Sequence, residues 1–541
     1  MTDADAGPSH SFAGDDPPYD PPEDLNLADY LLDARVREGL GDKEALRLDD
    51  RSLTYRQVQA LANRAAQAMA RLGLQQEERV LLGLLDGPEF VACLFGALKL
   101  GAVVVMVNPQ LGEVELTGIL HYSRARLAVV DASVLPVWEA AGRSSPWLRR
   151  LLVAGDAIGA HGNQPPHAAL ASALADGSDD FTNAPTHRDD PAIWLFSGGT
   201  TGRPKAVVQT HRSYANTTEC YAKRAVGYCA DDVTLAVPSL YFGYATGSNL
   251  FFPFAVGATA VLFPEPRTPE LLFEKLRRHR PTILVNVPTM VSRMVQHAEA
   301  HPELRAREAL ASLRFATSAG EALPVPLYER WKAAFGVELL DGLGTAEMWH
   351  IFLTNLPGAV RPGTLGRAVP GFEVRACDED GREVPRGEVG RLWVRGGSRA
   401  IAYWQNLPQT AEAFRGDWVA LGDLVSMDDD GYVSYCGRAD DVLKVGGKWC
   451  TPGEIEACLL QHPAVAECAV VGAEDEAGLT KPVAFVVTGA APPGLEEELK
   501  AFVLARLAAY KHPRRVVMVA ALPRTHLGKV DRGKLRALAR A

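Results

Sequence analysis

Short runs of hydrophobic residues alternate with amphipathic stretches along most of the chain. Residues 80–85 and 102–107 are almost wholly apolar and of strand length, which is typical of strands buried on both faces of a parallel sheet. Residues 53–72 and 88–100 instead place apolar side chains at helical spacing. Repeated strand–helix alternation predicts parallel sheets flanked by helices. Further strands of the same kind are predicted at residues 127–130, 193–196, 206–208, 259–262 and 282–285.

The pattern of predicted strands and helices changes towards the C-terminus. Short strands with Gly and Pro turns, such as residues 372–376 and 390–394, predict a smaller β-rich subdomain. After residue 437, strands and helices mix in a compact tail, with strands predicted at 466–471 and 482–488 and helices at 452–461 and 494–507. We therefore predict an α/β fold with a large N-terminal domain of layered, mostly parallel sheets, a β-rich subdomain and a small α+β C-terminal domain.

Three segments are expected from these changes. Residues 1–24 are rich in Asp, Pro, Gly and Ser without an apolar period, so we expect a disordered leader. Residues 25–437 form the large domain, and residues 438–541 the small one. The boundary is placed at residues 438–441, where a charged, polar segment separates two apolar blocks.

Composition and charge narrow the class of protein. The chain has 541 residues, 47% of them hydrophobic, and a formal net charge of -10, which favours a multidomain globular protein without a nucleic-acid or membrane partner. The N-terminus lacks a signal-peptide pattern, so we expect a cytoplasmic protein. None of the eight cysteines forms a C-x-x-C pair, which predicts free or buried thiols rather than a metal site.

One loop has the composition of a phosphate-binding site. It follows the apolar strand at 193–196 and reads Phe196-Ser197-Gly198-Gly199-Thr200-Thr201-Gly202-Arg203-Pro204-Lys205. Its glycines let the backbone approach a phosphate chain, and its hydroxyls and bases supply donors and positive charge. The loop is not a Walker A motif, because no Gly-Lys-Ser/Thr closes it.

This segment resembles the phosphate-binding loop of the adenylate-forming superfamily, which includes acyl-CoA synthetases, luciferases and the adenylation domains of peptide synthetases. Gly198 stands where that family usually has Ser, and Ala206 where it usually has Gly. The resemblance implies that ATP phosphates are contacted by Ser197, Gly199, Thr200, Thr201 and Lys205.

A second motif runs from Asp341 to Glu347 and reads Asp-Gly-Leu-Gly-Thr-Ala-Glu. As a dinucleotide fingerprint it lacks the third glycine and is weak. In the family this stretch lines the adenine and ends in a glutamate that holds Mg²⁺, a role that falls on Glu347 and suits a hard oxygen ligand. Ala346 replaces the family's phosphate-contacting Thr, which Thr345 is placed to compensate. The nucleotide-binding residues implied here are Gly320, Glu321, Asp341, Gly342, Leu343, Gly344 and Thr345.

A third motif combines Leu421-Gly422-Asp423 with Gly437-Arg438-Ala439-Asp440-Asp441. The Asp423 carboxylate is suited to two ribose hydroxyls, and Arg438 to a nearby hydroxyl or phosphate. By resemblance, Asp440 is the hinge that makes the small domain mobile. Lys444 and the following Gly446, Gly447 and Lys448 resemble the loop that the small domain presents when the thiol, coenzyme A, is bound.

The last motif is Pro523-Arg524-Thr525-His526-Leu527-Gly528-Lys529. It resembles the family's C-terminal motif, whose lysine bridges the carboxylate and the α-phosphate, so Lys529 is the implied catalytic lysine. A mixed anhydride with AMP converts a carboxylate into a competent acyl donor, and Mg²⁺, the Gly/Thr loop and Lys529 would stabilise the charge that develops on that path.

The expected acid pocket is aromatic and uncharged. Residues 240–247 read Leu-Tyr-Phe-Gly-Tyr-Ala-Thr-Gly and lack the Asp that amino-acid-activating members use for a substrate ammonium. Aromatic walls suit a flat aryl ring, and the segment resembles benzoate–CoA ligases, as does the stretch after Glu347. The pocket residues implied are Tyr241, Phe242, Gly243, Tyr244, Gly247, Ala319, His350 and Ile351.

The sequence leaves the exact reaction open between related alternatives. Gly243 removes volume where a benzoate enzyme carries Ala, and His350 is able to bond a polar ring substituent, so we favour anthranilate as the acid. Coenzyme A is favoured as the thiol because no carrier domain is attached, with a free acyl carrier protein or a downstream synthase as the alternative partner. A non-catalytic nucleotide-binding protein and a luciferase-type oxygenase are further readings, against which the joint presence of Lys529, Glu347 and the phosphate loop argues.

Overall fold

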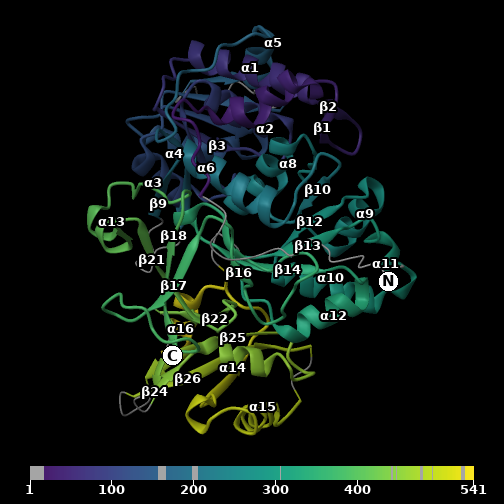
Figure 1. The fold of residues 1–541 in the computed structure, drawn as a ribbon, viewed down its shortest axis with the longest axis vertical. Helices are drawn as coiled ribbons and strands as arrows, with labels where there is room; N and C mark the ends of the chain where they lie inside the picture. The colour runs from purple at the N-terminus through teal and green to yellow at the C-terminus, as the bar shows by residue number, and fades with distance from the viewer. Residues whose placement is uncertain are drawn as a thin grey trace, which may run out of the picture.

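A computed structural model gives the structure of the chain. It describes residues 18–155, 166–197, 205–304, 306–439, 441, 443–445, 448–474, 479–489, 492–524 and 530–540, and at positions 444, 448 and 449 the backbone alone. The large domain occupies the upper part of the view in Figure 1, and the small C-terminal domain, coloured yellow-green to yellow, lies at the lower end.

An eight-stranded sheet forms the first layer of strands, in the order β19-β9-β8-β4-β3-β5-β6-β7. Its central strands are parallel, and their side chains are buried on both faces. The strands are β3 (Arg79–Gly83), β4 (Val103–Met106), β5 (Leu127–Asp131), β6 (Arg150–Ala154), β7 (His167–Ala169), β8 (Pro191–Ser197), β9 (Lys205–Thr210) and β19 (Ala402–Tyr403).

A nine-stranded sheet forms the second layer, in the order β16-β15-β14-β13-β12-β10-β11-β1-β2. Neighbouring strands are parallel in the central part, β14-β13-β12-β10-β11-β1. At the two edges, β2 and the pair β15-β16 are antiparallel to their neighbours. Its strands are β1 (Glu44–Arg47), β2 (Ser52–Thr54), β10 (Val233–Ala236), β11 (Thr259–Val261), β12 (Ile283–Asn286), β13 (Phe315–Ser318), β14 (Leu339–Gly344), β15 (Ile351–Thr354) and β16 (Arg367–Ala368).

Helices α1 (Tyr55–Arg71) and α2 (Pro88–Lys99) lie in the core shared by the two sheets. Thr54 caps α1, because its hydroxyl oxygen accepts a hydrogen bond from the Gln57 backbone N–H, and the side-chain oxygen of Gln57 accepts one from the Thr54 backbone N–H. Helices α3 (Glu113–Ser123) and α4 (Leu135–Arg143) cover the far face of the first sheet, and α9 (Pro269–His279), α10 (Pro288–Ala300) and α12 (Val325–Phe335) that of the second.

Shorter helices complete the large domain. The α-helices are α5 (Leu170–Ala175), α6 (His211–Thr217), α7 (Gly243–Thr246), α8 (Phe252–Val256), α11 (Ala306–Ala309) and α13 (Leu407–Ala413). The 3₁₀ and π turns are η1 (Asp29–Asp33), η2 (Val36–Leu40), η3 (Ala132–Val134), η4 (Thr218–Ala225), η5 (Gly247–Phe251), η6 (Pro302–Leu304) and η7 (Ala346–Met348).

The β-rich subdomain is an antiparallel five-stranded sheet. Its strands are β17 (Glu373–Cys377), β18 (Val389–Arg395), β20 (Phe414–Arg415), β21 (Trp418–Met427) and β22 (Val433–Arg438). Figure 1 shows it beside the second sheet and above the C-terminal domain, with β22 next to α14 (Pro452–Leu459) of that domain.

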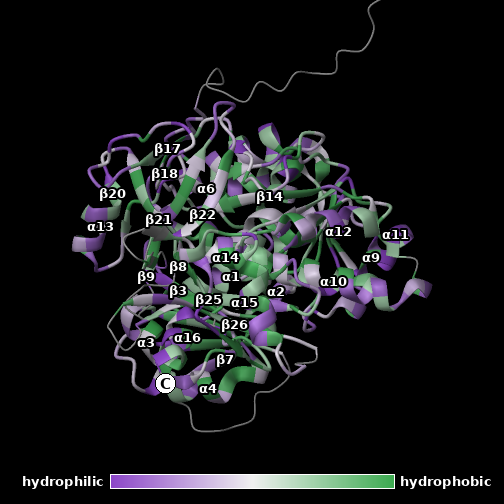
Figure 2. Cartoon of the chain, turned by 90° about the horizontal axis from the view of Figure 1, so that it is seen from below, coloured by the Kyte–Doolittle hydropathy of each residue, from purple (hydrophilic) through white to green (hydrophobic). Residues whose placement is uncertain are grey.

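The C-terminal domain has hydrophobic clusters of its own. Strands β25 (Glu467–Glu474), β26 (Thr480–Val487) and β27 (Arg515–Met518) form a three-stranded sheet, while β23 (Leu443–Val445) and β24 (Lys448–Cys450) form a separate hairpin. The helices are α14 (Pro452–Leu459), α15 (Leu495–Leu504), η8 (Ala509–Lys511) and α16 (Arg532–Arg540). In Figure 2 the inner strands are coloured as hydrophobic, and hydrophilic residues gather on the peripheral helices.

The α/β architecture predicted from the hydrophobic pattern is confirmed, with one correction. Residues 206–208, expected among the parallel strands, lie in β9, which pairs antiparallel with β8. A connection of seven residues, 198–204, is too short for the crossover that a parallel neighbour needs. All eight cysteines are free, as expected. No helix in the described part of the chain is long and apolar enough to cross a membrane.

The first residues described run along the large domain. Asn216 Nδ2 donates to the Tyr19 carbonyl oxygen at 3.0 Å, and Asp24 forms an isolated bridge with His187. The remainder of the predicted leader, residues 1–17, lies outside the described residues.

Candidate active site

The ends of the phosphate loop are held by a hairpin. Ser197, the last residue of β8, pairs with Lys205, the first residue of β9. The predicted loop therefore joins two adjacent strand ends. Gly199, Thr200 and Thr201 lie outside the described residues. The ammonium of Lys205 lies 5.0 Å from the ring centroid of Tyr403, close enough for a cation–π contact.

Glu347 lies in η7 directly after the end of β14. Its Oε1 accepts a hydrogen bond from the Tyr403 hydroxyl at 2.8 Å. Tyr403 comes from β19, which pairs with β9 next to the phosphate loop. The structure thus places the predicted metal ligand and Lys205, the last residue of the predicted phosphate loop, around the same tyrosine.

Two glycines allow β14 to lie against its neighbour. A Cβ at Gly342 would lie 2.7 Å from the Leu353 carbonyl oxygen, and one at Gly344 would lie 2.4 Å from that of His350. No larger residue fits these positions without displacing backbone. Leu343 and Thr345 are half-buried beside them, and the Thr345 hydroxyl is buried without a hydrogen-bond partner in the described part of the chain.

Asp341, in the middle of β14, lies at the register position opposite Ser318, the last residue of β13. Burial raises the pKa of the Asp341 carboxyl well above its usual value, which favours the uncharged form. Ala319 is buried at the end of β13, and Gly320 follows with a φ of 92°. Glu321 accepts a hydrogen bond from the Thr289 hydroxyl at 2.7 Å.

The predicted ribose-binding pair lies on the β-rich subdomain. Asp423 of β21 is opposite Arg438 of β22, and their Oδ2 and Nη1 atoms are 3.4 Å apart. The Tyr435 hydroxyl lies 3.5 Å from Asp423 Oδ1. The two residues that the sequence assigned to one site are therefore direct cross-strand neighbours.

The predicted acid pocket is built around Tyr244 and His350. The Tyr244 hydroxyl lies 2.6 Å from the Thr317 hydroxyl. His350 Nε2 lies 3.0 Å from the Tyr244 carbonyl oxygen and 3.2 Å from the Ser248 hydroxyl. Burial lowers the pKa of His350 to about 3, so the ring is neutral. The aromatic rings around it belong to Tyr221, Tyr244, Phe252 and Trp349.

Two glycines shape this pocket differently. At Gly247 a Cβ would lie 2.5 Å from His350 Cδ2, so the absence of a side chain lets the imidazole lie against the backbone. At Gly243 a Cβ would lie 3.0 Å from Leu195 Cδ1. The volume that the sequence assigned to a ring substituent at Gly243 is thus bounded by Leu195. The rings of Tyr241 and Phe242 contact each other in a tilted arrangement with centroids 4.3 Å apart, and Ile351 is buried at the start of β15.

Asp86 anchors the pocket segment and was missed by sequence reasoning. It follows β3 at the carboxyl end of the parallel sheet, where its Oδ1 accepts from the Leu240 backbone at 2.9 Å and its Oδ2 from Arg267 at 2.6 Å. Burial raises the pKa of Asp86 to about 6, against the opposing effect of Arg267. The position after a buried strand was the available signal. Thr317, Ser248, Tyr221 and Tyr403 were also missed.

The C-terminal domain contacts the large domain beside the predicted adenine site. Arg524 Nη1 lies 3.8 Å from Glu321 Oε1, and Arg524 Nη2 lies 2.8 Å from Glu467 Oε2 within its own domain. Several predicted residues lie outside the described part of the chain: Asp440, Gly446, Gly447 and Lys529. Lys444 and Lys448 lie on β23 and β24, and their side chains are not described.

The carboxylate of Glu347 suits an Mg²⁺ ion that is bound mainly by ATP, rather than a metal ion that is held by protein side chains alone. Within the described ranges no group of three or more His, Cys, Asp or Glu side chains is placed to hold a metal ion. Mg²⁺ bound to ATP commonly takes one or two carboxylates and completes its shell with phosphates and water. Glu347, with one oxygen bonded to a phenol, fits that pattern.

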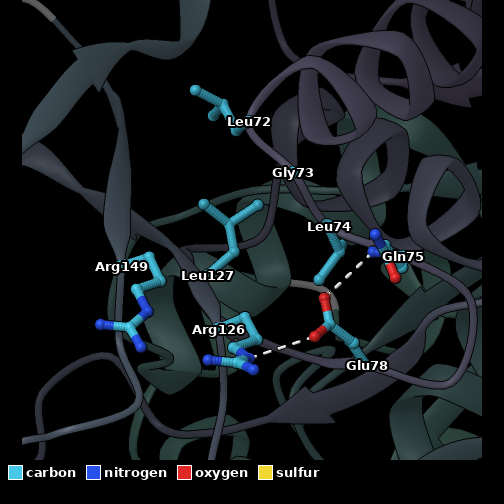
Figure 3. Close-up of a pocket in the computed structure, with 8 residues that line it drawn as sticks. All are labelled: Leu72, Gly73, Leu74, Gln75, Glu78, Arg126, Leu127 and Arg149. Atoms are coloured by element: carbon cyan, nitrogen blue, oxygen red, sulfur yellow. Dashed lines mark hydrogen bonds and ion pairs between the residues drawn. The ribbon is translucent and has the colours of Figure 1, made fainter.

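A separate cavity of about 350 Å³ lies away from these residues (Figure 3). Leu74, Leu127 and the guanidinium groups of Arg126 and Arg149 line it, between the end of α1 and the start of β5. Arg126 is paired with Glu78 at 3.1 Å. None of the predicted site residues lines this cavity.

Comparison with known proteins identifies the family of this chain. Residues 32–404 match the AMP-binding enzyme family, and residues 454–529 match the AMP-binding enzyme C-terminal domain. The chain is 43% identical over 520 residues to benzoate–CoA ligase of Thauera aromatica, covering 95% of this chain and 96% of the relative.

Two solved structures share the fold. The anthranilate CoA ligase AuaEII, solved with anthranoyl-AMP, has a TM-score of 0.89 and 37% identity, covering 96% of this chain and 98% of that one. A benzoate CoA ligase from Burkholderia xenovorans LB400 has a TM-score of 0.85 and 39% identity, covering 95% and 100%. The chain therefore belongs to the AMP-binding enzyme family, in the branch of the adenylate-forming superfamily that resembles benzoate–CoA ligases.

Proposed function

We propose that this chain activates an ortho-substituted benzoate, with anthranilate as the preferred acid, and transfers it to coenzyme A. The chain is an ATP-dependent aryl–CoA ligase of the AMP-forming acid–thiol class. An aromatic carboxylate and ATP yield an aryl-adenylate and pyrophosphate. The thiol of coenzyme A then attacks the acyl carbon, and AMP leaves with the electron pair of the broken acyl–phosphate bond.

The cluster of aromatic rings around Tyr244 and His350 is the observation that supports an aromatic substrate. The groups that contact Tyr244 and His350 are rings, hydroxyls and a carbonyl, and the imidazole is neutral. A flat aryl ring gains stacking and apolar burial there without needing a counter-charge. The relatives named for benzoate and anthranilate support the same class of acid.

His350 supports the preference for a ring substituent that donates a hydrogen bond. A carbonyl oxygen only accepts, so the Nε2 that lies beside the Tyr244 carbonyl carries the proton. The other nitrogen, Nδ1, is then an acceptor, and it is buried without a hydrogen-bond partner in the described part of the chain. An amino group on the substrate would supply the missing donor.

At the ATP end, we assign the phosphate contacts to Ser197, Lys205 and the loop between them, and the ribose to Asp423 and Arg438. Bound Mg²⁺ would supply positive charge to the phosphates, with Glu347 holding it. Glu347 is kept in place by Tyr403. Lys529 is assigned to the carboxylate and α-phosphate, and the small domain to presenting coenzyme A after it rotates about Asp440.

Coenzyme A is the proposed thiol, and a free acyl carrier protein is the alternative. We propose that the enzyme works in the cytoplasm, since none of its small-molecule substrates requires a membrane.

Pyrophosphate release with a panel of acids tests the proposal. Benzoate, anthranilate, salicylate and an aliphatic acid would be compared at equal concentration, with and without coenzyme A. The expected result is rapid release with the aryl acids, highest kcat/KM with anthranilate, and aryl–CoA and AMP formed when coenzyme A is present. Equal or better use of benzoate would overturn the anthranilate preference, and release without thioester would shift the acceptor to a carrier protein.

A further inference from the structure

Tyr403 is the described side chain whose hydroxyl bonds the carboxylate of Glu347. We propose that Tyr403 is a positioning residue that fixes one oxygen of Glu347 and leaves the other for the Mg²⁺ of MgATP. The inference rests on the proposed role of Glu347 as the metal ligand. Its geometric basis is the 2.8 Å hydrogen bond from the Tyr403 hydroxyl to Glu347 Oε1.

The backbone of η7 is held independently of Tyr403. Gln209 Nε2 donates to the Ala346 carbonyl oxygen at 2.6 Å, and the Ala400 backbone donates to that of Glu347 at 2.8 Å. The Ser398 hydroxyl donates to the Met348 carbonyl oxygen at 3.0 Å. All three carbonyls of the turn are therefore bonded without the phenol, so its hydrogen bond acts on the Glu347 side chain alone.

Tyr403 is itself rigidly placed. It pairs with Val207 across β19 and β9, and its backbone N–H donates to the Thr410 hydroxyl at 3.1 Å. Its ring packs edge-on against Phe414 with centroids 5.3 Å apart, and 7% of the residue is exposed. Burial and the charge of Glu347 raise the pKa of Tyr403, so the phenol stays protonated and donates.

The same ring also lies beside Lys205, the last residue of the predicted phosphate loop. Lys205, which closes that loop, has its ammonium 5.0 Å from the Tyr403 ring centroid. Tyr403 thus touches a residue of each motif, Glu347 by its hydroxyl and Lys205 by its ring. A Tyr-to-Phe change separates the two contacts, because it keeps the ring and removes the hydroxyl.

A hydrogen bond to a metal-binding carboxylate restricts the conformations of that side chain before the metal ion binds. Removing such an outer partner typically weakens metal affinity by about 10–100-fold. Tyr403→Phe should therefore raise the Mg²⁺ concentration needed for ATP binding by about tenfold. Binding of the aryl acid should not change, because within the described part of the chain Tyr403 shares no hydrogen bond with Tyr244 or His350.

The test is a binding titration without turnover. ATP binding to the full chain is measured by calorimetry over a range of Mg²⁺ concentrations with the acid omitted, and acid binding is measured separately. Tyr122→Phe is the matched control, because that phenol donates to the carbonyl oxygen of Trp404, the neighbour of Tyr403, at 2.5 Å and does not touch Glu347. The control should keep the wild-type Mg²⁺ dependence, and thermal unfolding should show all variants folded.

Glu347→Gln separates the two possible failures. If Glu347→Gln removes the Mg²⁺ dependence and Tyr403→Phe matches the wild type, the positioning role is overturned while the metal role stands. If Glu347→Gln leaves the Mg²⁺ dependence unchanged, the metal role of Glu347 is wrong, and the inference falls with it. A tenfold shift in Tyr403→Phe alone, with Tyr122→Phe unchanged, supports the proposal.

Discussion

The imidazole of His350 donates from Nε2 to the backbone carbonyl oxygen of Tyr244 across 3.0 Å. This bond ties a residue two positions after η7 to the segment that we propose as the wall of the acid pocket. It also fixes the tautomer of the ring, since a carbonyl oxygen cannot donate. The chemistry of the pocket therefore depends on His350 remaining neutral.

A pH dependence follows from the lowered pKa of His350. Burial places the pKa at about 3 in the folded chain, against about 6.5 when the chain is unfolded. As pH falls, this histidine therefore takes up a proton in the unfolded chain before it does so in the folded chain. The contribution of neutral His350 to the free energy of unfolding is complete above pH 6.5 and falls by about 1.4 kcal/mol per pH unit towards pH 3. Urea unfolding of the wild type and of His350→Gln between pH 7.5 and 5 measures this.

The difference between the two unfolding curves isolates the histidine. Gln places an amide nitrogen near the position of Nε2, so His350→Gln keeps a donor for the Tyr244 carbonyl and cannot take up the proton. The wild type should lose its advantage over the variant as pH falls. A constant difference across this range would show that His350 titrates normally in the folded chain.

Gly247→Ala should damage the acid pocket. The new methyl group would lie 2.5 Å from His350 Cδ2 and 3.0 Å from Phe252 Cζ, and such overpacking costs about 1–3 kcal/mol. We expect the KM for the aryl acid to rise by about tenfold while the KM for ATP changes little. Gly118→Ala is the control, because nothing lies within 4 Å of that Cβ. Equal KM values in both variants would contradict the placing of Gly247 in the pocket.

The sequence predicted those parts of the site that depend on local pattern. The loop between Ser197 and Lys205 was assigned from its composition and from the family resemblance, and Glu347 from the resemblance. The structure places Ser197 at the end of β8 and Glu347 just after β14. Asp423 and Arg438, the pair predicted to bind the ribose, were assigned from the motifs, and the structure makes them a direct cross-strand pair.

The parts that could not be predicted are contacts between distant elements. Tyr403 and Glu347 are 56 positions apart, and Tyr244 and Thr317 are 73 apart. Which side chains meet is decided by strand order and register, which the hydrophobic pattern does not encode. The filling of the space at Gly243 by Leu195 is of the same kind, since it depends on two sheets packing together.

Removing one partner of a buried ion pair in the N-terminal region should strongly destabilise the fold. Lys99 Nζ lies 2.5 Å from Asp33 Oδ2, with side-chain exposures of 1% and 8%. Removing one partner leaves a buried charge without its counter-charge and costs about 3–5 kcal/mol. Lys99→Met and Asp33→Leu should each lower the unfolding free energy by this amount in urea. The double variant should recover most of it, and an additive loss would mean that the two residues are not coupled.

Domain alternation predicts different effects on the two half-reactions. Asp440→Pro restricts the backbone at the proposed hinge, so rotation of the small domain should slow. Pyrophosphate exchange should be kept, while thioester formation should fall by at least tenfold, a barrier increase of about 1.4 kcal/mol. Both rates are measured on the same preparation. Equal loss of both would rule out a hinge role for Asp440.

The contact between Arg524 and Glu321 should favour the state in which the adenylate forms. Arg524 directly precedes the segment that contains Lys529, and Glu321 lies in the predicted adenine loop 3.8 Å away. Glu321→Gln keeps an acceptor for Thr289 but removes the charge. Because both side chains are partly exposed, the pair is worth no more than about 1 kcal/mol, and pyrophosphate exchange should fall by up to about fivefold. Glu467→Gln removes the intradomain partner of Arg524 and should leave exchange unchanged or faster. A fall in thioester formation from preformed adenylate in Glu321→Gln would contradict a role confined to the first step.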